Sequence, residues 1–171
     1  IAGPRMQAAG ATTIDRMETL SVGGFVEVIR HLPEILRLRR GLINACLEDK
    51  PDIYIGIDAP DFNLGVEKRL KRAGISTVHY VSPSIWAWRP ERINKIRAAV
   101  NHMLLILPFE EAIYREAGVP ASYVGHPLAD QFPLEIKQET VRDAPDVPRS
   151  LRVVAMLPGS RQREVETPAP L

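Results

Sequence analysis

The first 131 residues alternate short apolar runs with segments of helical spacing, and this alternation limits the choice of fold. Four runs are rich in β-branched or aromatic residues and predict strands: 53–57, 75–81, 102–107 and 121–124. The segments between them have helical patterns and connect to the strands through a few residues. Such short strand-helix-strand connections predict the α/β class, a parallel sheet with helices on both faces.

Composition restricts the setting in which this fold works. The chain is 45% hydrophobic and 25% charged, as in an ordinary globular protein, and its net charge of +1 does not predict a nucleic-acid partner. A single cysteine, Cys46, excludes an internal disulfide framework and fits the core of a protein in a reducing compartment. No apolar run has the length of a membrane span. The sequence opens without methionine on what reads as a strand end, so we expect it to begin inside a domain.

The stretch 51–63 combines a predicted strand with polar residues where that strand ends. Asp58 follows the run 53–57, and a carboxylate there is costly to bury without a partner or a function. Pro60 ends the ladder, while Asp61 is suited to a turn and Asn63 to the N-cap of the next helix. Ligands of parallel α/β sheets bind at the carboxyl ends of strands, so we expect Asp58, Asp61 and Asn63 to face one cleft. An alternative is that Asp61 and Asn63 only form the turn and the cap.

Residues 25–47 carry the longest helical pattern, which Pro33 is expected to bend or divide. The pattern is apolar over more than one face and has basic residues interspersed. A helix lying on an anionic bilayer surface has this composition, and so does a buried crossover helix with solvated arginines.

Both tryptophans, Trp86 and Trp88, lie in one proline-rich loop at 82–90, next to Arg89. Tryptophans in such a loop stack on a sugar, enter a headgroup layer or cap the core, and capping is the commonest of these roles.

The rest of the chain offers two weaker signals. His126 follows a glycine at a strand end, where a lone histidine is more often structural than catalytic. Beyond a predicted linker at 132–150, an apolar run at 151–157 predicts the first strand of a second domain, covering 151–171. Ser160 and Arg161 follow that run and form a combination suited to binding phosphate, although no P-loop or dinucleotide motif is present.

Six motifs in this order resemble the lipid-A-disaccharide synthase family of bacterial glycosyltransferases. In the one-letter code they are AGPRM at 2–6, GIDAPDFN at 56–63, HYVSPSIWAWR at 79–89, LPFE at 107–110, GHPLAD at 125–130, and LPGSR with EVE at 157–166. The resemblance implies two Rossmann-like domains of GT-B type. Residues 1–131 then form the N-terminal, acceptor-side domain, which is incomplete at its start, and only the beginning of the C-terminal nucleotide-sugar domain is present.

The resemblance also implies a reaction. A diacylglucosamine unit moves from its UDP derivative to the 6-hydroxyl of diacylglucosamine 1-phosphate, with inversion and without metal or cofactor. By position, Asp58 matches the essential aspartate, a candidate general base if partial burial raises its pKa above about 3.9. Arg161 matches the essential arginine on the UDP side, and Asp61, Asn63, His126 and Ser160 are expected to bind substrate.

Lipid substrates imply a cytoplasmic protein that is peripheral on the inner membrane. The residues expected to contact the membrane are apolar: Phe25, Val26, Val28, Ile29, Leu32, Ile35 and Leu36. Trp86 and Trp88 are secondary candidates. Whether the full-length protein is a homodimer is left open by the sequence, and the 171 residues alone are expected to be inactive. The rival interpretations are another UDP-sugar enzyme, such as an epimerase or a peptidoglycan glucosaminyltransferase, and a non-catalytic membrane-docking module.

Overall fold

The computed structural model describes residues 3–13, 25–132, 134–135, 152, 154 and 157, and for residues 4–5 and 25–30 it describes the backbone only. Residues 1–129 form one compact unit and residues 130–171 a second, of which few residues are described. Of the predicted strand at 151–157 only residues 152, 154 and 157 are described, and most of the predicted linker at 132–150 lies outside the described residues. The domain boundaries therefore stay predictions.

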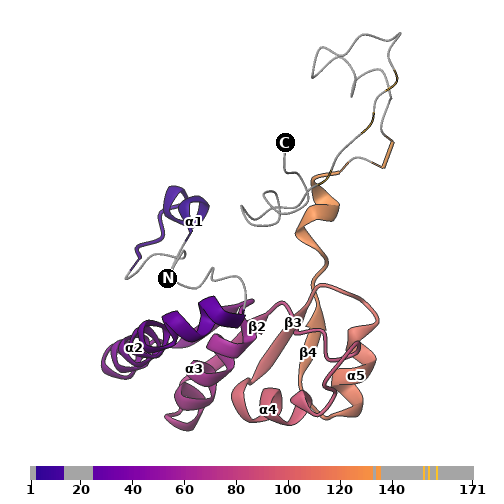
Figure 1. Ribbon diagram of the computed structural model, residues 1–171. Helices are drawn as coiled ribbons and strands as arrows, with labels where there is room; N and C mark the ends of the chain where they lie inside the picture. The colour runs from indigo at the N-terminus through magenta and orange to yellow at the C-terminus, as the bar shows by residue number, and fades with distance from the viewer. Residues whose placement is uncertain are drawn as a thin grey trace. The chain divides into compact units, whose positions relative to one another are not determined.

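The first unit contains a parallel sheet of four strands in the order β1-β2-β3-β4. The strands are β1 (Ile53–Ile57), β2 (Ser76–Tyr80), β3 (His102–Leu105) and β4 (Ala121–Tyr123). The helices that connect them are α3 (Pro60–Arg72), α4 (Arg92–Ala99) and α5 (Glu110–Glu116). Before the sheet come α1 (Pro4–Ala8) and α2 (Phe25–Asp49), and after it a 3₁₀ helix, η2 (Pro127–Asp130). The predicted parallel α/β architecture is confirmed (Figure 1).

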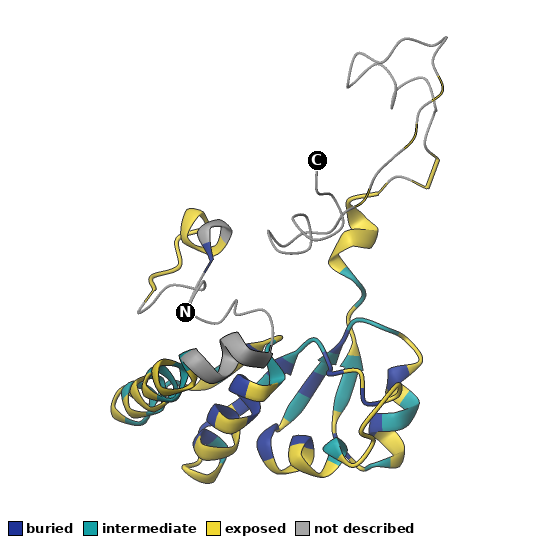
Figure 2. Ribbon diagram, viewed as in Figure 1, coloured by how far each residue is buried: buried dark blue, intermediate teal, exposed yellow. Residues whose placement is uncertain are grey.

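The three connecting helices cover one face of the sheet, because successive strands are neighbours and right-handed crossovers then fall on the same side. Gly56, His79 and Met103 are register partners on this covered face. The expectation of helices on both faces is therefore not met by the described residues. Ile53, Ile55 and Ile57 point to the other face and are 48%, 52% and 47% exposed, so β1 is not the fully buried strand that its composition suggested (Figure 2).

Two apolar clusters stabilise the covered face. The larger lies under α4 and α5, where Met103 and Leu105 of β3 pack with Ile96 and Tyr114. The smaller lies between α2 and α3 and is formed by the buried residues Phe62, Val66, Leu70 and Ile75. Burying a side chain of this size contributes about 1.5–3 kcal/mol relative to leaving it exposed.

Helix α2 continues through Pro33, so of the two expectations for this proline, a bend or a division, the division is excluded. Its side facing α3 packs against the smaller cluster, and this side consists of Ile35, Leu38, Leu42, Ile43, Cys46 and Leu47. Among the residues described, no helix is both long and apolar enough to cross a bilayer.

Candidate functional site

The carboxyl edge of the sheet carries unusual backbone geometry at two adjacent strand ends. Asp58 and Ala59, which follow β1, have φ angles of 49° and 42°, and Val81, which follows β2, has φ 75°. Left-handed geometry costs a residue other than glycine about 1–2 kcal/mol, and a β-branched valine is a genuine outlier there. Backbone strain of this kind persists where the surroundings impose it, commonly at functional sites.

Hydrogen bonds between the strand ends hold these turns in place. The Asp58 N–H donates to the carbonyl oxygen of Tyr80 at 2.9 Å, and the Val81 N–H donates to that of Leu104 at 3.1 Å. The parallel ladder is thus extended by one residue at the end of β1 and at the end of β2. In the turn after β1, the Asp58 side chain is exposed.

Helix α3 begins earlier than the sequence pattern indicated. Ala59 is the N-cap, without a side-chain bond, and Pro60 occupies the first helical position, where its fixed φ favours helix initiation. The prediction that Asn63 caps the helix is therefore wrong, because Asn63 lies inside the first turn. Asn63 is 7% exposed, and its amide bonds to the protein rather than facing outward with Asp58 and Asp61.

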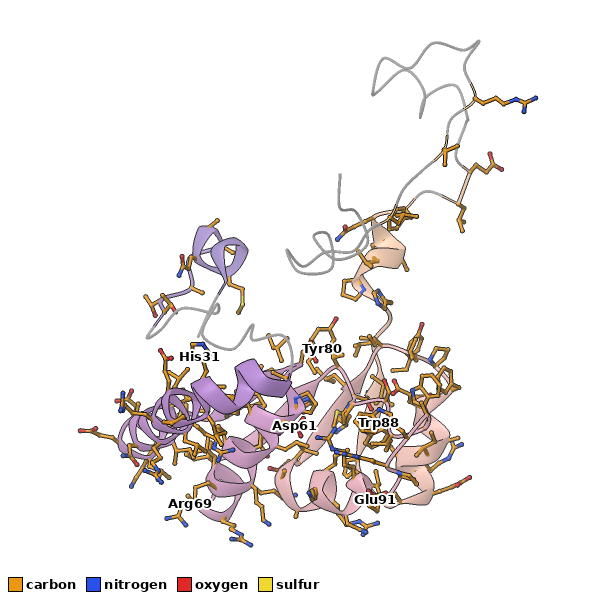
Figure 3. All side chains as sticks on the ribbon, viewed as in Figure 1. His31, Asp61, Arg69, Tyr80, Trp88 and Glu91 are labelled. Carbon is orange, nitrogen blue, oxygen red and sulfur yellow. The ribbon has the colours of Figure 1, made fainter. Side chains whose placement is uncertain are left out.

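Asp61 forms an ion pair with Arg92, the first residue of α4. The carboxylate is largely exposed and the guanidinium largely buried. Asp61, labelled in Figure 3, lies at the N-terminal end of α3, and its pair with Arg92 connects α3 with the N-terminal end of α4. It also places a carboxylate in the first turn of α3, where the helix dipole favours negative charge.

The tryptophan loop does not cap the core as such loops most often do. Trp86 and Trp88 are 50% and 56% exposed, whereas Ile85, which immediately precedes Trp86, is buried. Trp86 makes an edge-to-face contact with Phe109 at 5.2 Å between ring centroids. The Arg89 guanidinium lies 4.5 Å from the centroid of the Trp88 ring, within the range of a cation–π contact. The loop therefore presents aromatic rings and a cation to its surroundings.

Beneath this loop lies a polar cluster that sequence reasoning missed. The Ser82 and Tyr114 hydroxyl oxygens are 2.7 Å apart, and the Ser82 hydroxyl also reaches the carbonyl of Pro83. Glu110 is buried beside them, and burial raises the pKa of its carboxyl, which a hydrogen bond from Ser82 partly offsets. Burial also raises the pKa of Tyr114, to about 12. The signals in the sequence were two family motifs, LPFE at 107–110, which contains Glu110, and the motif at 79–89, which contains Ser82.

A second missed pair lies between α3 and the sheet. The Nδ1 atom of His79 and the Oε1 atom of Glu67 are 2.7 Å apart, and both side chains are fully buried. Their remaining atoms, Glu67 Oε2 and His79 Nε2, bond to nothing in the described part of the chain. The helical pattern around Glu67 is basic and amphipathic, and a charged residue in such a helix is ordinarily expected to face solvent. The sequence pattern therefore did not predict that Glu67 is buried against His79.

His126 and Asp58 follow the two outermost strands of the sheet, β4 and β1, at the same carboxyl ends. The Nδ1 atom of His126 accepts the Leu128 N–H at 3.1 Å. Three strand spacings of about 4.8 Å put the ends of β1 and β4 roughly 14 Å apart, so these side chains do not form one catalytic pair. Ser160 and Arg161 lie outside the described residues.

The four-stranded parallel sheet with its connecting helices defines a Rossmann-like α/β unit, consistent with a GT-B type N-terminal domain, and in such sheets ligands bind at the carboxyl ends of the strands. Residues 1–171 match the family model described as "Lipid-A-disaccharide synthetase". The chain belongs to this family.

Several curated relatives are named lipid-A-disaccharide synthase. The protein of Methylobacillus flagellatus is 58% identical over 171 residues, which is all of this chain and 45% of the relative. Those of Chromobacterium violaceum and Neisseria meningitidis serogroup A are each 54% identical over all of this chain and 44% of the relative. The chain thus spans slightly less than half the length of these relatives.

Proposed function

We propose that the full-length protein containing this chain is an inverting glycosyltransferase. It moves a diacylglucosamine unit from its UDP derivative to the 6-hydroxyl of diacylglucosamine 1-phosphate, forming a β-1,6-linked disaccharide and UDP. The observation that carries this proposal is the family match over residues 1–171, joined to identities above 50% with named synthases over the entire chain.

Asp58 is assigned as the general base of this reaction. Its carboxylate takes the proton of the acceptor 6-hydroxyl while that oxygen forms a bond to the donor anomeric carbon. The bond from this carbon to the diphosphate breaks at the same time, and UDP leaves with the electron pair. Asp58 is exposed in the described part of the chain, so the partial burial expected of a base has to come from bound substrate.

The leaving group requires positive charge, because a diphosphate departs without a metal ion in this proposal. Arg161 and Ser160 are assigned to the UDP side on the basis of their motif. Asp61 and His126 are assigned to acceptor binding, as exposed or half-buried residues at the carboxyl edge. The roughly 14 Å between the ends of β1 and β4 suits a substrate larger than one sugar ring.

The lipid substrates require contact with the inner membrane, and we assign this contact to the outer side of α2. This side carries a groove of about 410 Å³, lined by Leu32, Pro33, Leu36, Arg37 and Arg40. An apolar groove with two arginines complements acyl chains below anionic headgroups. Of the other expected contact residues, Ile35 packs toward α3 instead, and the side chains of Phe25, Val26, Val28 and Ile29 lie outside the described residues.

The test is transfer activity of the full-length protein with both lipid substrates, comparing wild type with Asp58→Asn. We expect wild type to form disaccharide and UDP, and Asp58→Asn to lose roughly a hundredfold or more in kcat with an unchanged melting temperature. A nearly active Asp58→Asn variant contradicts the base assignment, and His126→Ala is then the next variant to measure.

The same assay separates the rival functions. An epimerase converts the UDP-sugar in the absence of an acceptor, and a peptidoglycan glucosaminyltransferase requires a different acceptor. A membrane-docking module without catalysis releases no UDP at all. Wild-type protein that forms no disaccharide therefore refutes the proposed function, whatever the variants do.

A further inference from the structure

Both polar atoms of the Asn63 side chain form hydrogen bonds to β1 or to the residue that follows it, Asp58. The Nδ2 atom donates to the carbonyl oxygen of Asp58 at 2.8 Å and to that of Ile57 at 3.2 Å. The Oδ1 atom accepts the hydroxyl of Tyr54 at 3.0 Å. The Asn63 N–H also donates to the carbonyl of Ala59 at 3.0 Å. One residue thus holds three consecutive carbonyl groups, those of residues 57 to 59.

These three residues include both left-handed positions, Asp58 and Ala59. Neither is glycine, so the turn requires an external constraint, and Asn63 is the side chain that supplies it. A carboxylate that must reach one hydroxyl within hydrogen-bond distance depends on its backbone direction. The constraint therefore acts on the direction in which Asp58 points.

Tyr54 fixes the orientation of the Asn63 amide. Because the tyrosine hydroxyl donates, the amide oxygen faces Tyr54 and the two amide hydrogens face the carbonyl groups. Burial, together with the nearby charge of Glu67, raises the pKa of Tyr54 well above its ordinary value. The hydroxyl stays a donor at any pH at which the protein works, so this orientation does not titrate.

Gly56 allows α3 to approach the strand closely enough for these bonds. A Cβ added at Gly56 would lie 3.1 Å from the Asn63 Cβ and well inside contact distance of the Glu67 carboxylate. One helical turn beyond Asn63, the buried Glu67 bonds to His79 of β2. Two polar contacts, one turn apart, thus set the position of α3 against β1 and β2.

We propose that Asn63, oriented by Tyr54, is the positioning residue that fixes the backbone from Ile57 to Ala59 and so directs the Asp58 carboxylate at the acceptor hydroxyl. This inference rests on the proposed function, in which Asp58 is the base. It replaces direct substrate binding by Asn63 with an action through Asp58.

The experiment uses the full-length enzyme with Asn63→Ala, Tyr54→Phe, Asp58→Asn and the double variant Asp58→Asn/Asn63→Ala. The matched control is Asn101→Ala. Asn101 immediately precedes β3, at the end of the strands opposite to Asp58, and its Oδ1 atom accepts two hydrogen bonds from Thr77. This variant therefore removes comparable amide contacts far from Asp58. For each variant, kcat, the KM of both substrates, the melting temperature and hydrogen–deuterium exchange of the peptide containing Asp58 are measured.

We expect Asn63→Ala to lower kcat roughly tenfold to a hundredfold with both KM values nearly unchanged, and Tyr54→Phe to lower it about threefold to tenfold. Exchange at the Asp58 peptide should accelerate in both. The double variant Asp58→Asn/Asn63→Ala should have nearly the same kcat as Asp58→Asn alone, because both changes remove the same function. Asn101→Ala should lower the melting temperature without lowering kcat.

Two results would overturn the inference while leaving the proposed function intact. In the first, Asp58→Asn is inactive whereas Asn63→Ala and Tyr54→Phe both keep the wild-type kcat. The other is a double variant in which the two losses multiply, since Asn63 then acts independently of Asp58. A nearly active Asp58→Asn overturns the base assignment and the positioning role together. Tyr54→Phe keeps the test decisive if Asn63→Ala fails to fold.

Discussion

Glu110 shows how one buried residue makes stability depend on pH. Burial raises the pKa of its carboxyl above the ordinary value of 4.5, so the folded protein binds this proton more tightly than the unfolded chain does. As pH rises through the window above 4.5, the unfolded chain releases the proton first, and the free energy of unfolding falls. The contribution of Glu110 to stability is therefore most favourable at acid pH.

We predict that Glu110→Gln raises the melting temperature of the full-length protein at pH 7.5 and changes it little at pH 4. The amide cannot ionise, so the variant avoids the cost of a buried carboxylate only where wild type would carry one. Thermal unfolding across this pH range measures the effect. A difference between the two proteins that does not change with pH would contradict the assigned cause.

At the scale of elements, the two sides of α2 differ in what they contact. Leu38 and Leu42 pack toward α3, whereas Leu32 is 44% exposed beside the groove that contains Arg37 and Arg40. A crossover helix needs only the first side. The second side is the one to which the membrane contact is assigned, and that assignment stays a proposal.

We predict that Leu32→Gln combined with Arg37→Ala and Arg40→Ala releases the full-length protein from anionic vesicles without lowering its melting temperature. Each arginine near an anionic surface contributes about 1 kcal/mol, so the two alone should account for a loss of roughly thirtyfold in vesicle affinity at low salt. Sedimentation with vesicles of mixed neutral and anionic lipid measures this.

The control for this prediction is Leu38→Gln, on the side of α2 that packs toward α3. It should lower the melting temperature, because it places a polar amide against an apolar cluster, and leave vesicle affinity of the folded protein unchanged. Unchanged sedimentation of the triple variant would remove α2 as the membrane contact and leave the exposed tryptophan loop as the next candidate.

At the scale of the whole molecule, the described residues supply one side of the proposed reaction. Asp58, which is assigned to the acceptor side, is among these residues, whereas Arg161, assigned to the diphosphate, lies outside them. The open face of β1, with three isoleucines about half exposed, is also a surface that a folded protein ordinarily covers.

We predict that the 171-residue chain by itself catalyses no transfer, because it spans less than half the length of the named synthases and so lacks most of the domain that the family resemblance assigns to the nucleotide sugar. The assay is disaccharide formation by the purified chain beside the full-length protein under identical conditions. Turnover by the shorter chain would show that its own residues suffice for both substrates.

The sequence alone determined the class of fold, because the alternation of strand and helix periods depends on local patterns of apolar residues. It placed the four strands within a few residues of their bounds in the structure. The family motifs singled out Asp58 by its place after a strand.

Only the tertiary structure decided what each polar residue contacts. Asn63 turned inward and Trp86 and Trp88 turned outward, against the ordinary preference of each residue type at such positions. The pair of Glu67 with His79 joins residues that are distant along the chain, and its fit depends on the missing side chain of Gly56 on a third element. Contacts of this kind depend on how helices pack on the sheet, which no local pattern of residues encodes.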